Sequence, residues 1–236
     1  ATGQMGFKRN LTPGEIVEQV IHFARVLKKS GKHVTNVVVM GMGEPFHNYD
    51  AVMTAIDRLN DPEGMHLGAR RFTISTVGLI PAIQRFAAEK RQINLAVSLH
   101  AANDALRSSM MPINRRYPLK DLITAVRSYT ETTGRRVTFE WALIQDVNDG
   151  EKDAIELANL LKGILCHVNV IPLNPTRNFN GKATTHERAV SFKQALESRG
   201  IPCTVRLRRG IDIQAGCGQL ASRPVEATRD SSPVVL

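Results

Sequence analysis

The sequence has 236 residues, a formal net charge of +9 and an isoelectric point near 9.8. It has no run of about 18 apolar residues, and its first residues lack the apolar core of a signal peptide, so we expect neither a membrane span nor a secretory leader. The basic charge favours a polyanionic partner such as nucleic acid, although a solvated cationic face would give the same value.

The length suits one domain, which we place at residues 1–221, followed by a disordered tail at 222–236 that lacks hydrophobic periodicity. Three scattered cysteines do not form a disulfide framework, which favours the cytoplasm. Because the chain begins with Ala1 and has no start methionine there, we expect that its natural start lies upstream.

A helix is predicted from Thr12 to about Ser30. Thr12 suits the cap, Pro13 the first turn, and Glu15 the third position of a capping box. Its apolar positions keep helical spacing, at Ile16, Val20, Phe23 and Leu27.

Short apolar runs then alternate with helical patterns along the chain. Strands are predicted at residues 34–40, 72–75, 93–99, 137–144, 166–171 and 203–207. Helices are predicted at residues 49–59, 80–90, 119–132, 152–161 and 186–198. This alternation indicates an α/β fold with a parallel sheet, either open and doubly wound or a barrel.

Polar residues gather where the predicted strands end. They are Glu44, Ser75, Ser98, His100, Asn148 and Asn174. Parallel α/β folds place their active sites at the carboxyl ends of the strands, so the pattern indicates an enzyme.

The first of these strand ends carries the sequence Gly-Met-Gly-Glu-Pro at 41–45. Glycines there allow a ligand to approach the backbone, and Glu44 could accept hydrogen bonds from an ammonium group. The motif lacks the third glycine of a dinucleotide fingerprint, and Pro45 opposes immediate entry into a helix. An ordinary turn with a solvated glutamate would look the same.

The hydroxyl of Ser98 and the imidazole of His100 could bind a ribose or a carboxylate, although a single histidine is more often structural. Cys217 is flanked by glycines, whereas Cys166 and Cys203 lie in apolar strands and are expected in the core. Nearby arginines such as Arg206 would favour a thiolate at Cys217 if the fold brings them close.

Several motifs together resemble the RlmN/Cfr family of radical S-adenosylmethionine (SAM) RNA adenine methyltransferases. Residues 1–12 are similar to the stretch directly after that family's C-x3-C-x2-C motif. The later landmarks are 41–45, Ser-Thr-Val-Gly at 75–78, Ser-Leu-His at 98–100, Met-Pro-Ile-Asn at 111–114, Val-Asn-Asp at 147–149 and Gly-Cys-Gly-Gln-Leu at 216–220.

The resemblance implies a partial (β/α)6 radical-SAM barrel without its first strand and cluster loop. It implies SAM contacts by Gly43, Glu44, Ser75, Ser98, Leu99, His100 and Asn174. Cys217 would be the methyl carrier and pass through an S-methylcysteine intermediate. The [4Fe-4S] cluster of the complete protein would be held by cysteines upstream of Ala1, which leaves no metal ligand in this chain.

The same resemblance implies methylation of adenosine C2 in 23S rRNA and possibly tRNA, with an electron donor such as flavodoxin, in a monomeric protein without membrane contact. Proline at position 45 favours the C2 branch over the C8 branch, where alanine is usual. Without the cluster cysteines, the fragment alone is expected to be inactive. The alternatives are a C8 methyltransferase, a non-catalytic RNA-binding barrel, and an unrelated enzyme that uses Glu44 and His100 as acid and base.

Overall fold

The computed structural model describes residues 6–173 and 181–206. It contains one six-stranded sheet in which all neighbouring strands are parallel and follow chain order, from β1 to β6. The strands are β1 (Val37–Val39), β2 (Phe72–Thr76), β3 (Asn94–Ser98), β4 (Val137–Leu143), β5 (Cys166–Pro172) and β6 (Cys203–Val205). The prediction of a parallel α/β fold is confirmed.

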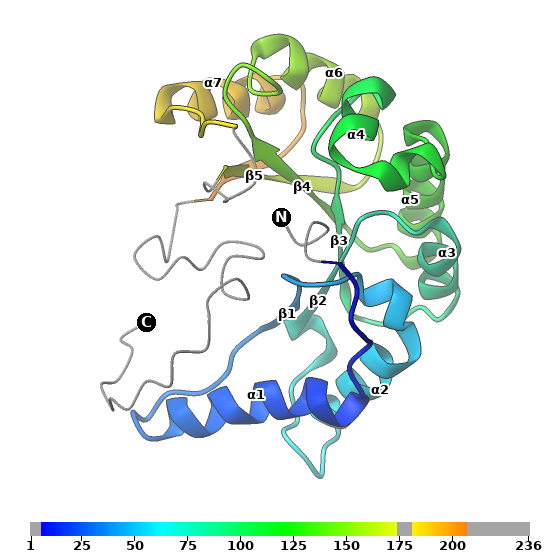
Figure 1. Cartoon of the computed structure of the whole chain (residues 1–236), viewed down its shortest axis with the longest axis vertical. Helices are drawn as coiled ribbons and strands as arrows, with labels where there is room; N and C mark the ends of the chain where they lie inside the picture. The colour runs from blue at the N-terminus through cyan, green and yellow to red at the C-terminus, as the bar shows by residue number, and fades with distance from the viewer. Residues whose placement is uncertain (1–5, 174–180, 207–236) are drawn as a thin grey trace.

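The helices follow the strands in alternation. They are α1 (Pro13–Lys28), α2 (Tyr49–Asn60), α3 (Ile80–Ala88), α4 (Asp104–Met110), α5 (Leu119–Thr133), α6 (Glu151–Leu161) and α7 (His186–Glu197), with 3-10 helices η2 (Pro45–Asn48), η3 (Ala69–Arg71) and η4 (Pro112–Arg115). Figure 1 shows α2 to α7 arranged along one face of a curved sheet.

The core fills the space between the sheet and these helices. Alternate residues of each strand point into it, and in β4 these include Phe139 and Trp141, which are almost fully buried. Aromatic rings of the helical layer continue the core, because Phe86 of α3 stacks on Tyr129 of α5 with centroids 5.9 Å apart. Each such buried side chain contributes about 1.5–3 kcal/mol, and together they hold the strand ends in place.

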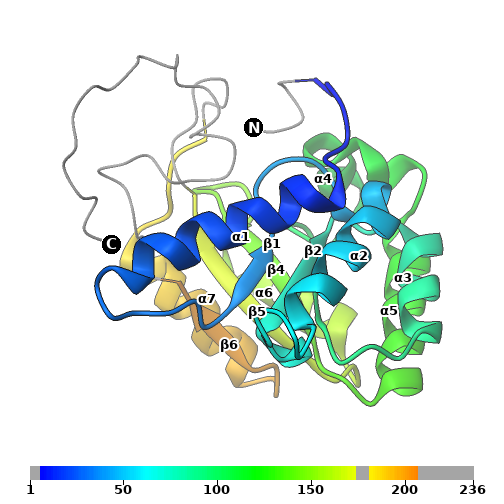
Figure 2. The ribbon, with the colours of Figure 1, turned by 90° about the horizontal axis from the view of Figure 1, so that it is seen from below.

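Helix α1 begins with the predicted capping box. The amide of Glu15 donates to the Thr12 hydroxyl, and the Thr12 amide donates to the Glu15 carboxylate at 2.8 Å. This helix lies beside α2 at the β1 end of the sheet (Figure 2). None of its residues is buried, and Phe23, placed on its apolar face by the spacing, is 56 % exposed.

Three sequence expectations differ from the structure. The strand predicted at 34–40 is only three residues long, and α4 was not predicted. Pro45 does not prevent helix entry, because it occupies the first turn of η2, where its missing N–H costs no hydrogen bond. The tail predicted at 222–236 lies outside the described residues. None of the described helices combines the length and apolar character needed to cross a bilayer.

Candidate active site

The loop after β1 is tied to the end of β2 by Glu44. Its carboxylate accepts one hydrogen bond from the Phe46 amide at 3.0 Å and another from the Val77 amide at 2.8 Å. Burial raises the pKa of Glu44, while these two amides act in the opposite direction. A carboxylate has four lone-pair positions, so Glu44 could still accept hydrogen bonds from a ligand ammonium group. Gly43 beside it has a positive φ of 76° and open space around it.

His100 follows β3 in the left-handed region, with a φ of 60°. Its Nδ1 accepts a hydrogen bond from the Ala142 amide of β4 at 3.0 Å, so the proton of the neutral ring lies on Nε2. Burial, aided by the charge of Arg107, lowers the pKa of His100 to about 4. Within the described residues Nε2 has no hydrogen-bond partner. At neutral pH the ring is therefore an uncharged donor, suited to a ligand oxygen.

Asn148 fixes the backbone around His100. Its side-chain amide donates to the carbonyls of His100 and Ala142, both at 2.8 Å, and its side-chain oxygen accepts from the Ile144 amide at 2.8 Å. Asn148 is fully buried, so these bonds are not exchanged with water. The landmark identified at 147–149 thus acts by holding the ends of β3 and β4 together.

Arg107 of α4 holds the ends of β2 and β3 together in the same way, and no pattern in the sequence predicted this role. Its guanidinium donates to the carbonyls of Val77 at 2.8 Å, Ser98 at 3.2 Å and Leu99 at 3.2 Å, and to Asn114 at 2.8 Å. Burial lowers the pKa of Arg107 to about 10. A single arginine in an unpredicted helix resembles a solvated surface residue, so only its position in space reveals its role.

These bonds form a continuous network across four strand ends. Glu44 joins the loop after β1 to Val77, Arg107 joins Val77 to Ser98, and Asn148 joins His100 to β4. The carboxyl ends of parallel strands share one edge of the sheet. The predicted gathering of polar residues at this edge is confirmed for the described residues.

The remaining candidate residues fall into three groups. Ser75 and Ser98 lie near the ends of β2 and β3, and within the described residues neither hydroxyl has a hydrogen-bond partner, so both are free for a ligand. Leu99 is fully buried, its amide donates to the backbone carbonyl of Glu140, and its own carbonyl accepts from Arg107, so its contact with the cofactor stays a prediction. The predictions for Asn174 and Cys217 lie outside the described residues.

Cys166 and Cys203 are core residues, as predicted. They are 4 % and 5 % exposed, and burial raises the pKa of their thiols to about 11 and about 12. Neither is suited to nucleophilic chemistry at neutral pH. The described ranges hold no group of three or more side chains that could ligate a metal ion.

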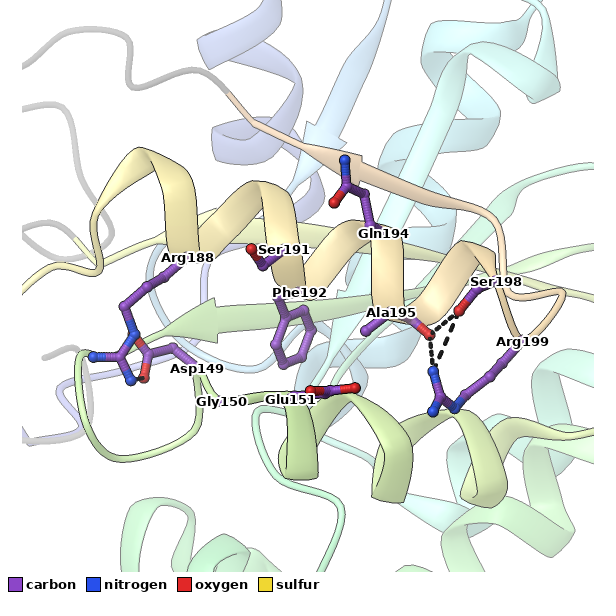
Figure 3. Close-up of a pocket in the computed structure, with 10 residues that line it drawn as sticks. All are labelled: Asp149, Gly150, Glu151, Arg188, Ser191, Phe192, Gln194, Ala195, Ser198 and Arg199. Atoms are coloured by element: carbon purple, nitrogen blue, oxygen red, sulfur yellow. Dashed lines mark hydrogen bonds and ion pairs between the residues drawn. The ribbon is translucent and has the colours of Figure 1, made fainter.

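A hollow of about 560 Å³ lies between α7 and the start of α6, apart from the strand-end network. Figure 3 shows Arg188 pointing toward Asp149, with Phe192 between the two helices and Arg199 turned back onto its own helix. Asp149 is nearly fully buried and also binds the Thr184 hydroxyl. The buried carboxylate of the hollow and both of its arginines are thus already bonded, so the hollow is a weaker candidate for chemistry.

Comparisons with known proteins show the family to which the chain is similar. Residues 2–158 match the family model of the radical SAM superfamily. The dual-specificity RNA methyltransferase RlmN 1 of Myxococcus xanthus is 51 % identical over 233 residues, which cover 99 % of this chain and 65 % of that protein. A probable dual-specificity RNA methyltransferase RlmN of Chloroflexus aurantiacus is also 51 % identical, over 94 % of this chain and 62 % of that protein. The chain thus spans just under two thirds of these relatives.

Solved structures give the same result. A radical SAM methyltransferase from Sphaerobacter thermophilus superposes with a TM-score of 0.90 at 57 % identity, over 92 % of this chain and 64 % of that chain. SuiB of Streptococcus suis, solved with S-adenosylmethionine, has a TM-score of 0.61 at 14 % identity, over 86 % of this chain and 45 % of that chain, and shows the shared fold alone. The chain therefore belongs to the radical SAM superfamily, whose members use S-adenosylmethionine together with a [4Fe-4S] cluster.

Proposed function

We propose that this protein methylates C2 of adenosine in 23S rRNA and tRNA, through an S-methylcysteine intermediate at Cys217. The observation that carries the proposal is the superposition on a radical SAM methyltransferase, with a TM-score of 0.90 and 57 % identity over 92 % of the chain. Relatives named as dual-specificity RNA methyltransferases support the RNA substrate. The net charge of +9 agrees with a partner whose phosphates supply much of the affinity.

The strand-end network fits S-adenosylmethionine. Glu44 offers a carboxylate with free lone pairs for the ammonium group, beside the open backbone at Gly43. The hydroxyls of Ser75 and Ser98 and the Nε2 proton of His100 supply neutral donors for the rest of the cofactor. We assign Asn174 to the same site by its sequence position after β5.

When bound, the cofactor and the cluster supply a methyl group and a carbon-centred radical. Cys217 would take up the methyl group through its thiolate sulfur, with S-adenosylhomocysteine as the leaving group, and would so give the reacting carbon a covalent tether. The tether is needed because C2 of adenine is electrophilic and cannot attack a sulfonium methyl group. Arg206, which follows β6 eleven positions before Cys217, is a candidate to favour the thiolate.

We further infer that a one-electron donor of the flavodoxin class reduces the cluster and that the protein acts as a cytoplasmic monomer. Pro45, which begins η2, supports the C2 branch by resemblance, because alanine is usual at this position in the C8 branch. Methylation at C8 of adenine is the alternative outcome of the experiment below.

The test is expression of the natural gene that encodes this chain in a bacterium that lacks its own adenine-C2 methyltransferase. We expect 2-methyladenosine in digests of purified 23S rRNA and tRNA, measured by liquid chromatography and mass spectrometry. Cys217→Ala should abolish it, whereas the core variant Cys166→Ala should retain it. Production of 8-methyladenosine would reassign the branch, and undiminished methylation in Cys217→Ala would overturn the mechanism.

A further inference from the structure

Helices α2 to α7 cover one face of the sheet and leave the other face turned away from them (Figure 1). The strand register places four polar residues in a row across this second face. Strand pairing places Ser98 beside Glu140, Glu140 beside Asn169, and Asn169 beside Thr204. Partners in register point to the same face of a sheet. The residues directly before and after Glu140 are aromatic core residues that face the helices, so Glu140 faces the other way.

Glu140 is a buried carboxylate that lacks an ion pair. It is 6 % exposed, and the Asn169 side-chain amide donates to both of its oxygens, at 3.2 and 3.1 Å. In the described part of the chain no cationic group lies within 4.0 Å of it. Burial raises the pKa of Glu140, and the more distant Arg206 only partly offsets this effect. A buried carboxylate with unused acceptor positions is costly, which is typical of a group that meets a ligand.

The position of Glu140 relates it directly to the proposed cofactor site. Its backbone carbonyl accepts the Leu99 amide at 3.0 Å, and its neighbour in the row is Ser98. Two residues further along β4, Ala142 holds the ring of His100. Glu140 therefore lies on the same face as Ser98 and next to the strand end that carries His100.

We propose that Glu140 is a further cofactor-contacting residue, whose carboxylate accepts hydrogen bonds from the vicinal ribose hydroxyls of S-adenosylmethionine, and that Asn169 is the positioning residue that orients it. This inference rests on the proposed function. The two oxygens of one carboxylate match the spacing of a vicinal diol, and acidic residues receive ribose hydroxyls in the same way in dinucleotide-binding folds. Arg206 supplies some positive charge at a distance but donates no hydrogen bond to Glu140. The carboxylate therefore has acceptor positions for further hydrogen-bond donors, such as the hydroxyls of a ligand.

The test measures ligand binding and not catalysis. Titration calorimetry would compare S-adenosylmethionine with its 2′-deoxy and 3′-deoxy analogues on the unmodified chain and on Glu140→Gln, which preserves the shape of the side chain. We expect the deoxy analogues to bind the unmodified chain about 10- to 100-fold more weakly. Glu140→Gln should weaken binding of the parent compound at least about tenfold and largely remove the difference between the three ligands.

The controls separate the possible failures. Glu131→Gln, a matched change at an exposed glutamate of α5, should leave all three affinities unchanged. An equal deoxy penalty in the unmodified chain and in Glu140→Gln would overturn the inference. So would a Glu140-dependent preference for S-adenosylmethionine over S-adenosylhomocysteine, which would assign the carboxylate to the sulfonium charge.

Two further outcomes decide the remaining cases. If Glu140→Gln does not fold, as judged by circular dichroism, full-strength binding of both deoxy analogues to the unmodified chain overturns the inference without the variant. If neither the unmodified chain nor the cluster-containing product of the natural gene binds S-adenosylmethionine, the proposed function fails and this inference fails with it. If only the product of the natural gene binds, the same titrations on that protein and on its Glu140→Gln variant decide the inference.

Discussion

Replacing Arg107 by methionine should destabilise the protein far more than replacing a surface arginine. The side chain is fully buried, and its guanidinium donates to three backbone carbonyls and to Asn114. Methionine keeps much of the packing of the aliphatic stem but leaves these four acceptors without their donor. Each buried acceptor left unsatisfied costs about 1 kcal/mol or more, while removal of the buried charge recovers part of the loss. We expect a net loss of about 3–5 kcal/mol.

The measurement is urea unfolding at pH 7, followed by circular dichroism. Arg127→Met is the matched control, because Arg127 also donates to two backbone carbonyls, those of Gly163 and Lys162, but is only partly buried and makes both hydrogen bonds at the surface. We expect the control to lose less than about 1 kcal/mol. A loss at Arg107 no larger than the loss at Arg127 would refute the conclusion that this guanidinium holds the strand ends.

Two further predictions follow from the pKa values. The pKa of His100 in the folded protein, about 4, lies below its usual value near 6.5, so its contribution to stability is present above pH 6.5 and is lost as the pH falls toward 4. The loss is at most about 3 kcal/mol. His100→Gln should reduce the difference in unfolding free energy between pH 7 and pH 4.5. An unchanged difference would contradict the lowered pKa of His100. Burial of Cys166 and Cys203 predicts that a thiol reagent at pH 8 modifies both slowly in the native protein and rapidly in urea, leaving Cys217 as the fast thiol. Rapid native labelling of Cys217→Ala would show that a core cysteine is accessible.

Much of the fold could be predicted from the sequence because its signals are local. The capping box at Thr12 and Glu15 predicted the start of α1, and apolar runs located the six strands of the described residues. Alternation of strands and helices then implied a parallel sheet with its polar residues at one edge. Local signals failed for α4, which is short and carries no apolar stripe. They also failed for Pro45, which was expected to oppose immediate entry into a helix but begins η2.

The candidate site divides in the same way. Sequence position alone identified Glu44, Ser75, Ser98 and His100, because residues after parallel strands share an edge wherever the chain runs between them. It could not show that Glu44 binds the Val77 amide, 33 positions later, or that His100 binds the Ala142 amide, 42 positions later.

The sequence by itself thus determined the order of the elements, the α/β class and the strand ends at which chemistry is expected. Only the tertiary structure decided which polar groups are free for a ligand and which are already bonded. In the tertiary structure Arg107 is buried beneath two strand ends. Glu140 lies on the sheet face turned away from α2 to α7, without an ion pair among the described residues. The physical reason is that the spacing of apolar residues indicates only which element a residue belongs to and which face of that element is buried. Its hydrogen-bond partners depend on the register between strands that are distant in sequence.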